Sequence, residues 1–201
     1  MFEIGPKELE QAREFIKEGK YKETFQILKD FEERENNSLQ DIVLCHLVKC
    51  NLFLSQGFFR KTVNLADQTY RESLELGKHI MTVDALLLKA NALLNGWGKI
   101  EDTNKIIKQV EELLKTIKEI PVVSKNQREG LIIYLKGMTF DPSLVPLGNI
   151  DLALKYYKQS LGLFESLGAK FDIGLCLLRI SNLTGIQMGN IDLALDYVEK
   201  A

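Results

Sequence analysis

The sequence contains one ten-residue stretch almost twice: "GNIDLALKYY" at residues 148–157 and "GNIDLALDYV" at residues 189–198, 41 positions apart. Its glycine can end one helix at a positive φ, and the asparagine that follows can cap the next helix. An apolar residue then begins that helix, and a small alanine stands three positions later. A repeat near 40 residues is typical of stacked helical units. We therefore expect function to lie on a surface that several units build jointly.

The same turn pattern occurs three more times, as "GKYKET" at 19–24, "GFFRKT" at 57–62 and "GKIEDT" at 98–103. The helix before each turn also carries a small residue, which lets two helices cross closely. These small residues are Ala12, Cys50, Ala90, Gly130 and Ser181. The pattern predicts five two-helix units, at residues 6–36, 38–77, 80–120, 124–168 and 170–201.

Apolar residues recur with helical spacing along the whole chain, and no segment shows the strict alternation of a half-buried strand. Ser38 with Asp41, and Ser124 with Gln127, resemble capping boxes that begin helices. Pro121 is expected to end the helix that begins near residue 100. The predicted fold is all-α, with about five antiparallel helix-turn-helix repeats.

These units resemble the tetratricopeptide repeat (TPR) family, in its longer form of about 40 residues. The features that carry the resemblance are the small crossing residue, a turn in which glycine is followed by Asn or Asp and then an aromatic or apolar residue, and the small residue that comes next. This last position is filled by Thr24, Thr62, Thr103, Ala153 and Ala194. The resemblance implies a right-handed α-solenoid with the first helix of each unit lining a concave groove. The chain departs from the family by using threonine at three of these positions. It also inserts "TFDPSLVPL" at 139–147, which we expect to be an ordinary surface loop.

Composition is that of a folded protein, with 45% hydrophobic and 27% charged residues among 201. The net charge of −2 favours neither nucleic acid nor an anionic membrane as a partner. No apolar run is long enough to span a bilayer, and the N-terminus lacks the pattern of a signal peptide. Three cysteines inside helical patterns indicate a reducing compartment, so we expect a cytoplasmic protein.

No cluster of residues indicates catalysis, a metal or a cofactor. Two isolated histidines, His46 and His79, are too few for a metal site. Cys45 and Cys50 lie five residues apart on one helix and point in different directions. "GNIDLA" has no strand before it, so it is no dinucleotide-binding loop. We expect a protein that is not an enzyme.

Three asparagines, Asn51, Asn91 and Asn182, each follow a small crossing residue directly. The resemblance implies that this position faces the groove and holds the backbone of a bound peptide. Each asparagine could instead bond a neighbouring helix within the array. Arg13 holds the equivalent place in the first unit and would meet an acidic group of the ligand. Leu54 and Leu94, about one turn later, would supply apolar contacts.

The sequence thus predicts a protein–protein interaction scaffold that binds a peptide or helix of a partner in its concave groove. One alternative is an assembly or autoinhibited element, whose groove is filled by its own C-terminal segment or by a second copy in a homodimer. Another is a targeting module of a longer regulator. Because the sequence stops at "DYVEKA", within an amphipathic helix, we expect the array to continue beyond residue 201. Trp97 could be an exposed anchor for a partner, but we expect it to pack between adjacent hairpins at the widened turn.

Overall fold

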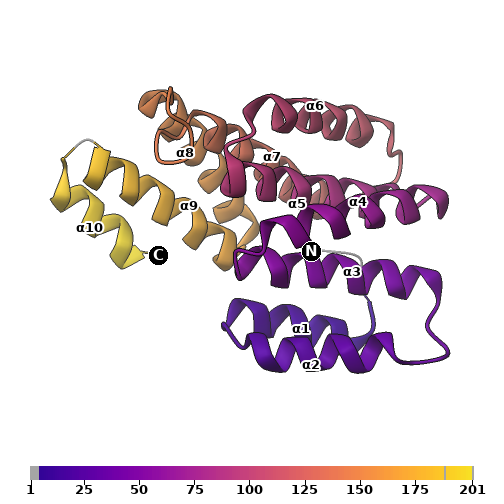
Figure 1. Ribbon diagram of the computed structural model, residues 1–201. Coiled ribbons are helices and arrows are strands. Elements are labelled where there is room, and N and C mark those ends of the chain that lie inside the picture. Colours follow the sequence, from indigo (N-terminus) through magenta and orange to yellow (C-terminus); the bar gives the residue numbers. More distant parts are fainter. Residues whose placement is uncertain (1–4, 188, 201) are drawn as a thin grey trace. The chain divides into compact units, whose positions relative to one another are not determined.

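A computed structural model describes residues 5–187 and 189–200. Within those ranges the chain forms ten α-helices and no strand, and neighbouring helices pack antiparallel in sequence order (Figure 1). This confirms the predicted all-α class. The helices are α1 (Lys7–Lys17), α2 (Tyr21–Glu32), α3 (Leu39–Ser55), α4 (Phe59–Glu75), α5 (His79–Trp97), α6 (Ile100–Thr116), α7 (Val122–Phe140), α8 (Ile150–Leu167), α9 (Lys170–Asn182) and α10 (Ile191–Lys200). A π-helical turn, Leu183–Gln187, directly follows α9.

The turns between paired helices use glycine in two different ways. Four of the five turn glycines have a positive φ, as predicted: Gly19 (73°), Gly57 (74°), Gly98 (59°) and Gly189 (70°). Gly148 does not, so the prediction is wrong there. A Cβ at Gly148 would lie 2.5 Å from the backbone nitrogen of Pro142 and 2.6 Å from the carbonyl oxygen of Phe140. The fourth turn therefore needs glycine because the backbone of the inserted loop approaches it closely.

Helix starts follow the predicted caps with one exception. Ser38 Oγ accepts a hydrogen bond from the Asp41 backbone N–H at 3.1 Å, and Asn149 Oδ1 accepts one from the Leu152 N–H at 3.0 Å. The capping box predicted at Ser124 is wrong, because α7 already begins after Pro121. The φ of −56° at Pro121 suits a chain that is about to enter a helix. Ser124 Oγ instead accepts a hydrogen bond from Arg128 within α7.

The chain divides into two compact units. Unit 1 contains the described residues up to Trp97 together with Lys108–Glu119, and unit 2 contains Gly98–Ile107 and the described residues from Ile120 onward. The helix α6 therefore contributes its first turns to unit 2 and the remainder to unit 1.

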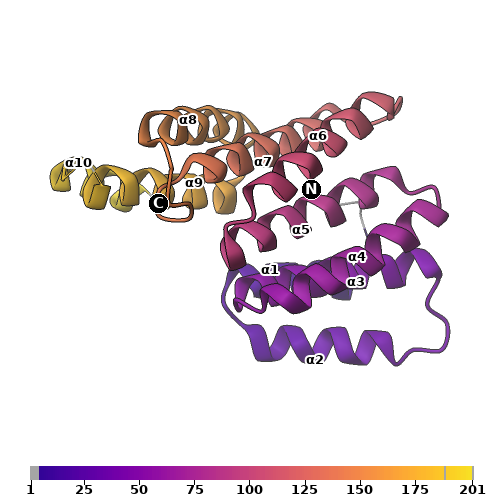
Figure 2. The same cartoon turned by 45° about the horizontal axis from the view of Figure 1, so that its top comes forward.

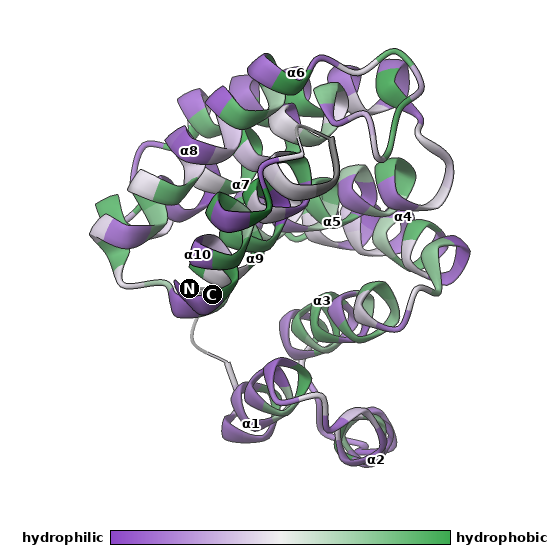
Figure 3. Cartoon of the chain, turned by 90° about the vertical axis from the view of Figure 1, so that its left-hand side faces the viewer, coloured by the Kyte–Doolittle hydropathy of each residue, from purple (hydrophilic) through white to green (hydrophobic). Residues whose placement is uncertain are grey.

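In unit 1, the first helices of successive hairpins lie side by side. The helix α3 packs against both α1 and α5, and α4 packs against α3 and α5 (Figures 1 and 2). The small crossing residues Ala12, Cys50 and Ala90 are fully buried at these contacts. Figure 3 shows α3 as largely hydrophobic around its circumference, as expected for a helix with neighbours on several sides.

In unit 2, α7 and α8 approach closely because α7 carries two glycines. A Cβ at Gly130 would lie 2.6 Å from Phe164 Cε1, and one at Gly137 would lie 2.7 Å from Tyr157 Cδ1. Both aromatic rings are fully buried. The glycines thus make room for two large side chains that α8 contributes to the core.

Candidate functional site

Asn51 and Asn91 occupy equivalent positions on the adjacent helices α3 and α5, and both are half-buried. Asn51 Nδ2 donates to the carbonyl oxygen of Leu47 at 3.1 Å, within its own helix. Asn91 accepts from Asn95 Nδ2 at both its side-chain and its backbone oxygen, again within one helix. Among the described residues, these hydrogen bonds of Asn51 and Asn91 stay within one helix and do not bridge to a neighbouring helix.

Arg13 lies on α1, which packs against α3, but its side chain is only 9% exposed. Its Nη1 donates to Glu10 Oε1, and the carboxylate of Asp84 acts on it electrostatically. Burial lowers the pKa of Arg13, while Glu10 and Asp84 oppose that shift. The charge of Arg13 is thus already matched by carboxylates of this chain. The structure does not present it as an open receptor for an acidic group.

The two predicted groove leucines have different surroundings. Leu54 is half-buried and packs against the core of unit 1 at the end of α3. Leu94 is 1% exposed and is a core residue, so its expected place on an open groove is wrong. Leu94 is buried because other helices pack around most of α5. Eleven residues of α5 are buried. Of the two leucines, only Leu54 can touch a ligand.

Asn182 belongs to unit 2, where it is the last residue of α9. It is half-buried, and among the described residues its side chain has no hydrogen-bond partner. Leu178, one turn earlier, is 52% exposed, and Phe171 is 45% exposed at the start of the helix. Asn182 therefore belongs to an apolar exposed face of α9. Arg13, Asn51 and Asn91 belong to unit 1, and Asn182 belongs to unit 2.

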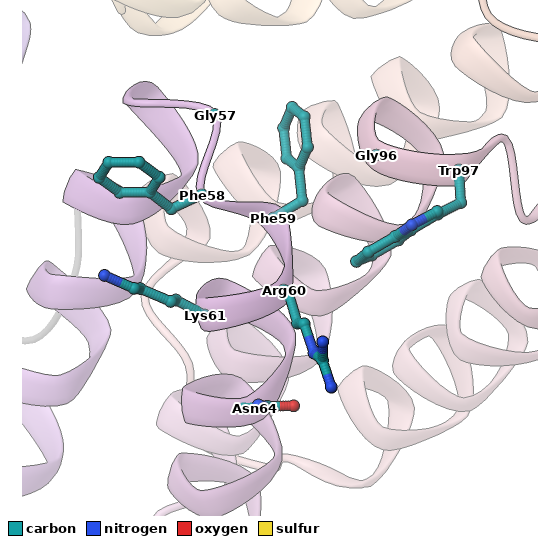
Figure 4. A pocket seen from close by; sticks show the side chains of 8 residues that line it. All are labelled: Gly57, Phe58, Phe59, Arg60, Lys61, Asn64, Gly96 and Trp97. Carbon is teal, nitrogen blue, oxygen red and sulfur yellow. The ribbon is translucent and has the colours of Figure 1, made fainter.

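A surface pocket that the sequence did not predict lies in unit 1 at the turn between α3 and α4. Its volume is about 450 Å³. It is lined by Gly57, Phe58, Phe59, Arg60, Lys61, Asn64, Gly96 and Trp97. We call it the Trp97 pocket. Trp97 is 50% exposed, and Figure 4 shows its indole reaching from the end of α5 toward Arg60 and Phe59. The side chain lines an open hollow, whereas we expected it to fill the space between hairpins.

The inserted segment at 139–147 is anchored by a buried polar network in unit 2. Asp141 is fully buried and accepts hydrogen bonds from the Tyr157 hydroxyl at 2.8 Å and from the backbone N–H of Ser143 at 2.9 Å. Arg179 Nη1 lies 3.9 Å from Asp141 Oδ2, and its Nε lies 3.3 Å from the Tyr134 hydroxyl. The segment is thus held firmly at its first residues, while Leu147 near its end is 97% exposed.

A signal for this network was present in the sequence. An aspartate before proline, followed by serine, is typical of a turn in which the aspartate bonds the backbone two residues on. The partners Tyr157 and Arg179 could not be predicted, because they reach Asp141 from two other helices.

The described residues show no group of three His, Cys, Asp or Glu side chains that could hold a metal ion. Cys45, Cys50 and Cys176 are free and buried. In the same ranges no helix is both long enough and apolar enough to cross a bilayer. No protein-family model matches the chain, and no curated protein matches it significantly. Its likeness to the TPR pattern therefore rests on the residues and helices described above.

Proposed function

We propose that this chain is a TPR-like helical array that acts as a protein–protein interaction scaffold. Small buried residues at the helix crossings and after the turns support the TPR-like part of the proposal. Ala12, Cys50 and Ala90 are fully buried at the helix crossings. The small residues after the turns, Thr24, Thr62, Thr103 and Ala153, are also fully buried. Such a set of small buried residues at a repeating interval is what stacked hairpins require.

The observation that carries the binding role is the paired position of Asn51 and Asn91. Both lie half-buried at equivalent places on adjacent helices, and their hydrogen bonds remain within their own helices. A side-chain amide can donate to a peptide carbonyl and accept from a peptide N–H without reading the ligand's sequence. We propose that the two asparagines hold the backbone of a partner segment across α3 and α5, and that Leu54 contacts an apolar side chain.

Each such hydrogen bond contributes about 1 kcal/mol net, so the asparagines alone give a modest affinity. A micromolar dissociation constant is expected when apolar contacts are added. The experiment is a selection of binding peptides from a random display library against the purified chain. The selected peptide is then titrated against the Asn51→Ala/Asn91→Ala variant by isothermal calorimetry.

We expect the double variant to fold normally and to bind the peptide about tenfold or more weakly, since two hydrogen bonds are lost. Asn104→Ala is the matched control, because Asn104 is an exposed asparagine on α6 outside the pair. Circular dichroism melting verifies folding. Unchanged affinity in the double variant would remove the asparagines from the binding site.

A second candidate function is self-assembly, which the surface of α10 favours. Ile191, Leu195 and Val198 lie on one face of this helix and are 67%, 56% and 50% exposed. An apolar stripe of this kind can pair with another helix. Light scattering over a range of concentrations tests it. A dimer in the unmodified chain that Leu195→Asp converts to a monomer would support assembly, and a monomer at all concentrations would exclude it.

A further inference from the structure

The Trp97 pocket combines exposed aromatic rings with cations that pair with no acidic side chain among the described residues. Phe58 and Trp97 are 45% and 50% exposed. Arg60 and Lys61 are exposed too, and neither forms an ion pair with another described residue. Lys61 Nζ instead lies 4.9 Å from the ring centroid of Phe58 and 5.6 Å from that of Phe53. The surface is therefore both apolar and positively charged.

The arrangement of the side chains gives the pocket two flanks. Figure 4 shows Trp97, Phe59 and Arg60 around one side of the first turn of α4, and Phe58 with Lys61 on the other side. Gly96 allows this arrangement, because a Cβ there would lie 2.8 Å from Phe59 Cβ. The end of α5 can therefore lie directly against the start of α4. The volume of about 450 Å³ is large enough for one aromatic side chain.

The charge of this pocket differs from that of the other hairpin turns. In the first hairpin, Lys20 pairs with Glu18, and Glu23 stands where α4 has Lys61. The corresponding first turns of α6, α8 and α10 carry Asp or Glu, which favour the positive end of a helix. The first turn of α4 has no acidic residue. Arg60 and Lys61 can thus bind an acidic group that comes from outside the unit.

We propose that the Trp97 pocket is a second docking surface, which binds a partner segment with an aromatic side chain next to carboxylates. The aromatic side chain enters the hollow beside Trp97 and Phe59, and Arg60 and Lys61 bind the carboxylates. Tryptophan and arginine are the side chains most enriched among residues that dominate binding energy at protein interfaces. Two cations are too few to bind a polyanion such as nucleic acid on a chain of net charge −2.

The test uses a fluorescein-labelled synthetic peptide in which phenylalanines alternate with aspartates. One matched peptide has asparagine in place of every aspartate, and another has serine in place of every phenylalanine. Fluorescence anisotropy is measured with the unmodified chain, with Arg60→Glu/Lys61→Glu and with Trp97→Ala. The control variant is Lys22→Glu, because Lys22 holds the place of Arg60 in the first hairpin and is also exposed.

We expect the acidic-aromatic peptide to bind the unmodified chain and the Lys22→Glu control alike, and both matched peptides to bind much more weakly. The charge reversal and Trp97→Ala should each weaken binding about tenfold or more. Increasing salt should weaken binding of the acidic peptide, because the pocket charges are exposed. Melting curves show whether each variant is folded, and the charge reversals at the exposed Arg60, Lys61 and Lys22 are not expected to alter them.

Absence of binding to the unmodified chain, equal binding of the asparagine peptide, or equal binding to all variants would overturn the proposal. A dimer of the unmodified chain that the charge reversal dissociates would assign the pocket to a second copy and would overturn it as well. The Asn51→Ala/Asn91→Ala variant should bind the acidic-aromatic peptide normally. Failure of the asparagine pair and failure of the pocket are therefore distinguishable.

Discussion

The hydroxyl of Tyr157 on α8 donates a hydrogen bond of 2.8 Å to Oδ2 of Asp141, and both side chains are fully buried. This contact ties the inserted loop to the helix that follows it. Burial and the neighbouring charge of Asp141 raise the pKa of Tyr157 far above its ordinary value, so the hydroxyl remains a donor at all ordinary pH values. The inserted loop is thus fixed to unit 2 by a buried side-chain hydrogen bond.

Tyr157→Phe should lower the free energy of unfolding by about 2 kcal/mol, because a buried carboxylate loses one of its donors. Urea denaturation measures the change. Tyr156→Phe is the matched control: Tyr156 is the adjacent residue on α8, stacks on Phe140 at 5.8 Å, and makes no hydrogen bond with another described residue. Its substitution should change stability by less than about 0.5 kcal/mol. Equal effects of the two changes would contradict the role given to the Asp141 contact.

Replacement by alanine should change the free energy of unfolding in opposite directions at two glycines, Gly162 and Gly148. Gly162 is exposed within α8, and a Cβ there meets nothing within 4 Å. Gly162→Ala should therefore raise the free energy of unfolding by about 0.5–1 kcal/mol, through helix propensity. Gly148→Ala should lower it, because a Cβ at Gly148 meets backbone atoms of Pro142 and Phe140. Thermal melting of both variants checks the pair, and a stabilising Gly148→Ala would refute the close approach.

Because its thiols are buried, the protein should lose stability at alkaline pH. Burial raises the pKa of Cys50 from 9.0 in the unfolded chain to about 12 in the folded protein. The folded state therefore holds the thiol proton more tightly than the unfolded chain does. The protonated thiol contributes fully to the free energy of unfolding below pH 9, and this contribution is lost as the pH rises toward about 12. Cys50→Ala should make the fall of the unfolding free energy above pH 9 less steep. Denaturant titrations at a series of pH values measure this slope, and identical slopes would contradict the burial of this thiol.

The capping box at the start of α3 gives a local test of helix stability. Ser38→Ala removes the oxygen that accepts from the Asp41 N–H and should cost about 1 kcal/mol. Ser55→Ala, at the other end of the same helix, should change the free energy of unfolding by less than about 0.5 kcal/mol, because Ser55 is exposed and its side chain makes no hydrogen bond with another described residue. Chemical denaturation of the two variants measures the difference. Equal losses for Ser38→Ala and Ser55→Ala would contradict the capping role of Ser38.

Local signals in the sequence were sufficient for the helices. Glycine turns, asparagine caps and apolar spacing each depend on neighbouring residues, so an all-α chain of consecutive antiparallel helices could be predicted. The prediction was wrong at Ser124, where Pro121 began the helix earlier, and at Gly148, where a close contact with residues 140–142 replaced a positive φ.

The candidate sites were less predictable because they depend on contacts between helices. The burial of Leu94 follows from the number of helices around α5, and the burial of Arg13 brings it under the influence of Asp84, far away in sequence. The Trp97 pocket joins the end of α5 to the start of α4. Its one local signal was the absence of an acidic residue among Phe59, Arg60 and Lys61.

The most direct test of the scaffold proposal is the behaviour of the asparagine side-chain amides when a selected peptide binds. We would record nitrogen–proton correlation spectra of the labelled chain during the titration. The proposal predicts that the side-chain NH₂ signals of Asn51 and Asn91 shift together in proportion to bound peptide, while that of Asn104 stays in place. Saturated binding with unmoved Asn51 and Asn91 signals would contradict the central claim and would locate the ligand elsewhere on the molecule.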